Sequence, residues 1–177
     1  RDNAHSTITN NQIISHVSEG IRTEEQSQAI IKNNFISNNS RSGVFIYDQS
    51  QANITNNVIS LNTFSGIGTS SQAQATIDNN VINSNFIHGI HTIQQSKAIV
   101  LNNTLVANGT HGIGCGEDSS CNVINNISVL NKGGGIIGKS RNNFTNLKYN
   151  LSNNNNIGNF DDFYTANELS AWGNIQV

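Results

Sequence analysis

The sequence predicts an all-β protein whose chain winds into roughly seven stacked coils of about 23 residues each. One observation is a pair of neighbouring asparagines that returns every 23 residues, at Asn10/Asn11, Asn33/Asn34, Asn56/Asn57, Asn79/Asn80, Asn102/Asn103 and Asn125/Asn126. A second is that the segments between these pairs align residue by residue, as residues 52–74 do with residues 75–97. A fixed period of about 20–50 residues is the signature of a solenoid or a similar repeat architecture.

Each coil contains three short runs in which apolar and polar residues alternate, which indicates strands with one buried face. We use "column" for the same position in successive coils. The first run has an inward column at Ile21, Val44, Ile67, Ile90, Ile113 and Ile136, and a varied outward column at Arg22, Phe45, Gly68, His91, Gly114 and Ile137. The second run has an Ala-x-Ile pattern, and the third follows the asparagine pair. Three short strands per repeat and no helical stripe favour a β-solenoid over a β-sandwich.

The asparagines have a physical reason to recur in a stacked coil. Neighbouring strands lie about 4.8 Å apart, so an amide can donate to the asparagine of one coil and accept from that of another. Asparagine also tolerates the left-handed backbone of a tight corner. A further column, Asn39, Asn62, Asn85, Asn108 and Asn131, with His16 in the first copy, predicts another such corner.

The repeat weakens toward the C-terminus. We expect coils over residues 1–155 and a capping segment over residues 156–177, with a short helix at 166–171. Aromatic and apolar residues concentrate in that segment, which suits a cover for the last coil. The chain begins mid-repeat at Arg1, so we expect a fragment of a longer protein with a neighbouring domain at its N-terminal end.

Composition narrows the class of partner and the compartment. Charged residues make up only 11% of the chain and the net charge is −2, which argues against a nucleic-acid surface. No apolar run reaches the roughly 18 residues of a membrane span. Cys115 and Cys121 either form a disulfide across residues 116–120, as suits an oxidising compartment, or are two small buried thiols. We expect an extracytoplasmic protein, whether secreted, periplasmic or at the cell surface.

Chemistry-bearing side chains gather on the outward face of the first run. His88 and His111 are one coil apart, so about 5 Å from each other. His91 follows His88 by three residues, on the outward face of the strand that contains Ile90. We interpret His88, His91, His111 and Tyr47 as candidate catalytic residues, because an imidazole titrates near neutral pH and suits proton abstraction. Arg22, Arg41, Glu24 and Phe45 are candidate substrate-binding residues. Two other readings stay open: His88 and His111 hydrogen-bond the backbone at a turn, or the three imidazoles bind a metal.

The recurring unit, Asn-Asn-x-Ile followed by Asn and then Gly-Ile, resembles the right-handed parallel β-helix repeats of the pectate-lyase-like superfamily. Within that superfamily it is most similar to the sugar-binding-and-hydrolysis group that includes the mannuronan C5-epimerases. The epimerases' Asp-Pro-His-Asp tetrad is absent, since the chain has no proline, and the acidic pairs that hold calcium in pectate lyases are not found. We therefore expect no cofactor; calcium stays open as an alternative, although it has no clear site.

The resemblance implies a carbohydrate-active or carbohydrate-binding protein acting along an extended, acidic polysaccharide. If it is an enzyme, the resemblance implies a polysaccharide lyase or a uronate C5-epimerase. The alternative is a non-catalytic structural or adhesive repeat module of a larger secreted or surface protein, which the low charge and the missing tetrad favour.

Overall fold

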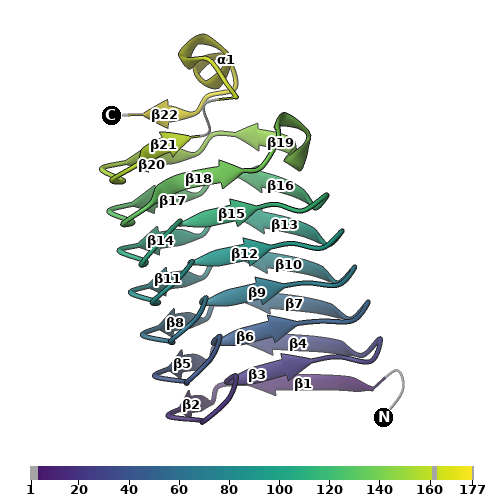
Figure 1. The fold of residues 1–177 in the computed structure, drawn as a ribbon. Helices are drawn as coiled ribbons and strands as arrows, with labels where there is room; N and C mark the ends of the chain where they lie inside the picture. Colours follow the sequence, from purple (N-terminus) through teal and green to yellow (C-terminus); the bar gives the residue numbers. More distant parts are fainter. Residues whose placement is uncertain (1–3, 161–162, 177) are drawn as a thin grey trace.

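The chain winds through three parallel sheets, and each coil adds one strand to every sheet (Figure 1). The structure is a computed structural model and describes residues 4–160 and 163–176. The first sheet comprises β1 (His5–Thr9), β4 (Gln28–Lys32), β7 (Gln51–Thr55), β10 (Gln74–Asp78), β13 (Lys97–Leu101), β16 (Ser120–Ile124) and β19 (Phe144–Lys148). The predicted β-solenoid of about seven coils and three strands per coil is confirmed.

The other two sheets use shorter strands. The second sheet comprises β2 (Gln12–Ile14), β5 (Phe35–Ser37), β8 (Val58–Ser60), β11 (Val81–Asn83), β14 (Thr104–Val106), β17 (Ile127–Val129), β20 (Leu151–Asn153) and β22 (Ile175–Gln176). The third sheet comprises β3 (Ile21–Thr23), β6 (Val44–Ile46), β9 (Ile67–Thr69), β12 (Ile90–Thr92), β15 (Ile113–Cys115), β18 (Gly134–Gly138) and β21 (Gly158–Phe160). A 3-10 turn, η1 (Arg141–Asn143), and a helix, α1 (Ala166–Ala171), complete the described elements.

The core is a stack of identical inward columns. Register is maintained at 23 residues, as when Ile67 pairs with Ile90 and Ile90 with Ile113 in the third sheet. These isoleucines are fully buried, as are Ile54 and Ile77 of the first sheet. Stacking like on like lets each β-branched side chain pack against its copies above and below, which explains why the sequence period does not drift.

The two asparagines of each pair have different roles. The first adopts a left-handed backbone, as at Asn56 (φ 56°) and Asn79 (φ 55°), and turns the chain from the first sheet into the second. The second is buried: the Nδ2 group of Asn57 donates to the Oδ1 atom of Asn80 at 3.0 Å and to the Ile31 carbonyl at 2.9 Å. The Asn57 backbone N–H also donates to that Oδ1 atom, at 2.9 Å. The amide ladder is thereby confirmed.

The second asparagine column behaves in the same way at the next corner. The Nδ2 group of Asn62 donates to the Oδ1 atom of Asn85 at 2.9 Å, and both side chains are fully buried. The first ladder continues past the clear repeats through Asn150 and Asn174, with steps of 24 residues instead of 23. The extra residue of the first such step, from Asn126 to Asn150, is accommodated where β16 pairs with β19, between Cys121 and Asn122.

The predicted helix is confirmed as α1, and it lies at the C-terminal end of the stack (Figure 1). The Thr165 hydroxyl accepts a hydrogen bond from the Glu168 N–H while the Glu168 carboxylate accepts from the Thr165 N–H, a reciprocal cap. Leu169 of α1 and Tyr164 join the hydrophobic core, so they cover the last coil. No helix in the described part of the chain is long and apolar enough to cross a membrane.

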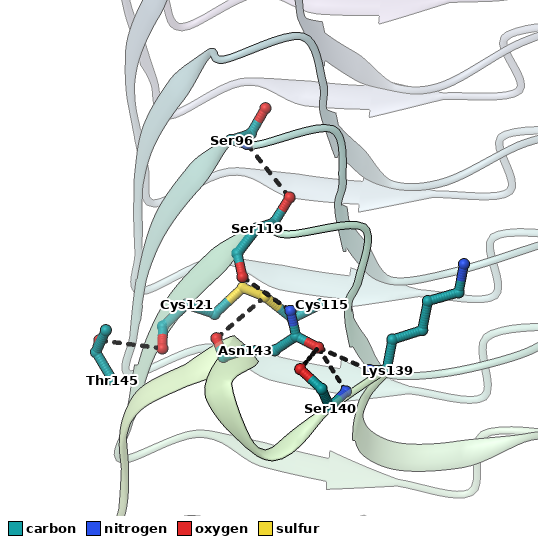
Figure 2. Close-up of a disulfide and its surroundings, with 8 residues drawn as sticks. All are labelled: Ser96, Cys115, Ser119, Cys121, Lys139, Ser140, Asn143 and Thr145. Carbon is teal, nitrogen blue, oxygen red and sulfur yellow. Dashed lines mark hydrogen bonds between the residues drawn. A yellow bond between two sulfur atoms is a disulfide. The ribbon is translucent and has the colours of Figure 1, made fainter.

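Cys115 and Cys121 form a disulfide, which decides between the two alternatives left by the sequence (Figure 2). Both cysteines occupy inward columns and are buried. Asn143 of η1 lies directly beside them: its Nδ2 group donates to the Ser119 carbonyl at 2.9 Å, and its Oδ1 atom accepts from the Ser140 N–H at 2.7 Å. The disulfide thus closes the corner between β15 and β16, next to the coil in which the register changes.

Candidate functional site

The predicted site residues lie on or beside the outer face of the third sheet, which we call the third-sheet face. Arg22, Phe45 and His91 occupy its central column, at the middle of β3, β6 and β12. One flanking column contains Glu19, Ser42, Ser65, His88 and His111, and the other contains Glu24, Tyr47, Ser70 and Ile93. The structure separates the predicted residues into two groups on this face, an aromatic platform and a histidine cluster.

The aromatic platform consists of Arg22, Phe45 and Tyr47. The rings of Phe45 and Tyr47 stack with centroids 5.7 Å apart. The Arg22 guanidinium lies 5.8 Å from the Phe45 centroid and 5.4 Å from that of Tyr47, a cation–π arrangement. Gly68, next in the column, makes room for Phe45, because a Cβ atom there would lie only 2.8 Å from the Phe45 Cδ2 atom. The platform is therefore a flat, half-buried aromatic surface of the kind that contacts apolar ring faces.

The charges around the platform balance one another. The Nε atom of Arg22 contacts the Oε2 atom of Glu24 at 2.6 Å. The Oε1 atom of Glu19 lies 3.9 Å from Arg22 and 3.4 Å from Arg41. Burial raises the pKa of Glu19, but hydrogen bonds from Ser18, the backbone and Arg41 outweigh it and lower the pKa overall. Both arginines thus already face carboxylates, which an anionic ligand would have to displace or share.

The histidine cluster consists of His88, His91 and His111. The His88 ring lies 4.2 Å from the His91 ring and 5.2 Å from the His111 ring, measured between centroids. The predicted spacing of about 5 Å between His88 and His111 is confirmed, and the structure shows in addition that the His88 and His91 rings touch. Thr110, which the sequence analysis missed, contacts the Nδ1 atom of His88 through its hydroxyl at 2.6 Å.

Two of the three imidazoles hydrogen-bond the backbone of the next coil. The Nδ1 atom of His111 accepts from the Gly134 N–H at 2.7 Å, and that of His88 accepts from the His111 N–H at 3.4 Å. An Nδ1 atom that accepts an N–H cannot carry a proton, so these rings are neutral with the proton on Nε2. Burial, with the nearby His91 and His111, lowers the pKa of His88 to about 3, and burial also lowers the pKa of His111.

His91 differs from its two neighbours. Among the described residues its ring nitrogens have no hydrogen-bond partner, and its only ring contact is with His88. Burial lowers the pKa of His91, while the Glu117 carboxylate acts in the opposite direction. Gly114 leaves space for the ring, since a Cβ atom there would lie 3.3 Å from the His91 Cδ2 atom. His91 is therefore a neutral, half-buried imidazole with its nitrogens available to a ligand.

The structure does not bring the platform and the cluster together. Strand pairing places Phe45 two coils from His91 and Arg22 three coils away, which corresponds to about 10 Å and 14 Å. Tyr47 belongs with Phe45 and so lies away from the imidazoles. No group of three or more His, Cys, Asp or Glu side chains among residues 4–160 and 163–176 is placed to hold a metal ion, the three histidines included. A single ligand that contacts both groups must therefore span about 10 Å or more.

The sequence gives different signals for Glu117 and for Thr110. Glu117 lies in an outward column after β15 that also contains Glu25 and Asp48, so its acidic side chain can be placed near the face from the repeat. Thr110 follows no repeated pattern, because its role depends on the direction in which the His88 ring turns.

Comparison with known proteins agrees with this architecture. A family model described as "Right handed beta helix region" matches residues 1–157. The chain belongs to this right-handed β-helix family. Comparison with the curated proteins finds no match.

Solved right-handed β-helices resemble the chain in fold. The periplasmic alginate epimerase AlgG superposes with a TM-score of 0.77 at 20% identity, over 87% of this chain and 41% of the epimerase. The A-module of the Azotobacter vinelandii mannuronan C-5 epimerase AlgE4 superposes with a TM-score of 0.57 at 15% identity, over 90% of this chain and 57% of the module. The chain thus spans about half the length of these structures, and the likeness shows the fold alone.

Proposed function

We propose that the third-sheet face binds, and at its histidine cluster acts on, an extended acidic polysaccharide. The observation that carries the proposal is His91, the one imidazole of the cluster in which neither ring nitrogen has a hydrogen-bond partner among the described residues. Support comes from the distant likeness to two proteins named as epimerases of alginate or mannuronan. In the proposal the polymer lies along the solenoid axis, with one sugar over the platform and another at His91.

The two groups take different roles in this proposal. Phe45 and Tyr47 contact the apolar face of a sugar ring, and Arg22 pairs with its carboxylate in place of Glu24. His91 accepts the C5 proton, α to a uronate carboxylate, from the sugar about two coils further along. A proton from solvent water, delivered to the opposite face of C5, gives the epimer, and the proton on His91 returns to solvent. Departure of the C4 oxygen, which takes up a proton, gives an unsaturated uronate and a shortened chain.

A non-catalytic repeat module is the second candidate. One observation favours it: the Nδ1 atoms of His88 and His111 already bond the backbone of the next coil, which is a structural task. In both candidates the disulfide agrees with an extracytoplasmic location, which we propose for this protein.

The test is an assay on oligomannuronate, oligoguluronate and oligogalacturonate with the folded protein. Lyase action is detected by the absorbance of the unsaturated product, and epimerase action by deuterium taken up at C5 in D₂O. Turnover of any of the three supports the enzyme, and binding without turnover supports the module. A folded protein that neither binds nor converts any of them would rule out the proposed function.

A further inference from the structure

A groove of about 550 Å³ runs over the outer face of the first sheet, on a different side of the solenoid from the histidine cluster. It extends from β1 to β19, which is six steps between coils and about 29 Å. This volume is in the range of ligand sites in proteins, about 300–1,000 Å³. None of the site residues predicted from the sequence lies on this face.

Two outward columns form the walls of the groove. One wall contains His5, Gln28, Gln51, Gln74, Lys97 and Ser120. The opposite wall is mixed, with Ile30, Asn53, Thr76 and Ile99 in successive coils, and the backbone of the alanine column forms the floor. Residues two apart on a strand are about 7 Å apart, so the walls enclose a narrow channel along the solenoid axis.

The glutamines of the first wall are available for hydrogen bonding. Gln28, Gln51 and Gln74 are exposed, and no partner is found for their amides among the described residues. They contrast with the asparagines of the corners, whose amides are paired from coil to coil. A row of three unpaired amides at the interstrand spacing of about 4.8 Å offers a donor and an acceptor at every step.

The lining also constrains the charge of the ligand. Among the residues that the structure describes, His5 and Lys97 are the only ionisable side chains that line the groove, and no carboxylate does. Ile30 and Ile99 expose apolar surface on the opposite wall, with 47% and 43% of each residue exposed. A chain of neutral sugars matches this lining, because its hydroxyls donate or accept as an amide requires and its ring faces are apolar.

We infer that the first-sheet groove is a second glycan site, which binds a linear neutral polysaccharide along the solenoid axis. An extended peptide is the other linear polymer that fits by length, but strand addition is unavailable at this face. Each interior strand of the first sheet already pairs with a neighbour on both sides, so its backbone groups are used between coils. The inference is independent of the function proposed for the third-sheet face.

The test is titration of the intact protein with cellohexaose, mannohexaose and xylohexaose, observed through its side-chain amide NMR signals. We expect shifts in the amides of Gln51 and Gln74, and a loss of affinity of about tenfold in the Gln51→Ala/Gln74→Ala double variant. Asn83→Ala, which removes an amide from the outer face of β11 in the second sheet, is the matched control and should bind as the unaltered protein does.

Three results would overturn the inference. One is a folded protein that binds none of the three neutral oligosaccharides. Another is neutral binding that the double variant leaves unchanged. The third is a groove that takes hexamannuronate or an extended peptide in preference to the neutral sugars. His91→Ala distinguishes the two faces. This variant alters only the third-sheet face, so it should bind the neutral oligosaccharides as the unaltered protein does, whether or not the third-sheet face is active.

Discussion

His88 and His111 occupy the same position in successive coils, and their rings stack with centroids 5.2 Å apart. The Nδ1 atom of each ring accepts a backbone N–H from that same column one coil further along, from His111 and Gly134 respectively. Protonation of Nδ1 would replace an accepted hydrogen bond by two facing donors. These backbone N–H groups therefore favour the neutral form of both imidazoles. As a result, the free energy of unfolding depends on pH.

We predict that acid destabilises this protein through His88. Its pKa in the folded protein is about 3, below the ordinary 6.5 of an unfolded chain. The unfolded chain therefore binds a proton that the folded protein does not, and the free energy of unfolding falls as pH decreases from 6.5 toward 3. One such proton gives a slope of at most about 1.4 kcal/mol per pH unit. Urea unfolding at a series of pH values measures this slope.

The matched variant is His88→Ser, because serine occupies the same column at Ser42 and Ser65. We expect this variant to be less stable at pH 7, by about 1 kcal/mol for the lost hydrogen bonds, and to have a flatter acid slope. An acid slope that is the same in both proteins would show that His88 is not the titrating group.

We predict that His91 can be removed with little effect on stability. His91→Ala loses no hydrogen bond among the described residues, so the free energy of unfolding should change by about 0.5 kcal/mol or less. If His91 is the general base, turnover on the polymer that the protein accepts should fall by about 10²–10⁴. Ile137→Ala, in the same outward column two coils further along, is the control for a general change of the surface. Full turnover in His91→Ala would assign the proton transfer to another group.

We predict that the disulfide stabilises the corner between β15 and β16 without determining the fold. Cys115 pairs in register with Thr92, and Cys121 with Ala98, so Cys115→Thr/Cys121→Ala restores the residues of the preceding coil. The short loop that the bond closes corresponds to about 2 kcal/mol. Thermal unfolding with and without reductant should show a loss of this size in the unaltered protein and no response in the variant. Equal responses in both would remove the disulfide as the cause.

The fold could be predicted from the sequence because one physical constraint repeats in every coil. Ile67, Ile90 and Ile113 must face the interior and stack in register, and the asparagine pairs must turn the chain at the same point. Six aligned copies therefore predict the strands, the columns and the ladders. The helix α1 was predictable for another reason, its isolated apolar and aromatic residues beyond the last repeat.

The site was less predictable because it depends on features that do not repeat. The columns placed His88, His91 and His111 together, but not the Thr110 hydroxyl or the direction of each Nδ1 atom. The shape of the surface cannot be read from the sequence, so the first-sheet groove was not predicted, although its glutamine column recurs at the 23-residue period. Hydrogen-bond direction and surface shape arise only after the coils are stacked.

The last prediction separates the two asparagines of one pair. Asn80 is buried, and its Oδ1 atom accepts from both the backbone N–H and the Nδ2 group of Asn57. Asn80→Ala would leave the buried backbone N–H of Asn57 without a partner, while the Asn57 Nδ2 group keeps the Ile31 and Thr55 carbonyls, so we expect a loss of about 1–3 kcal/mol in the free energy of unfolding. Urea unfolding measures it. Asn79→Gly is the control: Asn79 is exposed with φ 55°, a backbone that glycine adopts freely, so its loss should be less than about 1 kcal/mol. Similar losses in the two variants would mean that the corner is stabilised by its left-handed turn and not by the buried ladder.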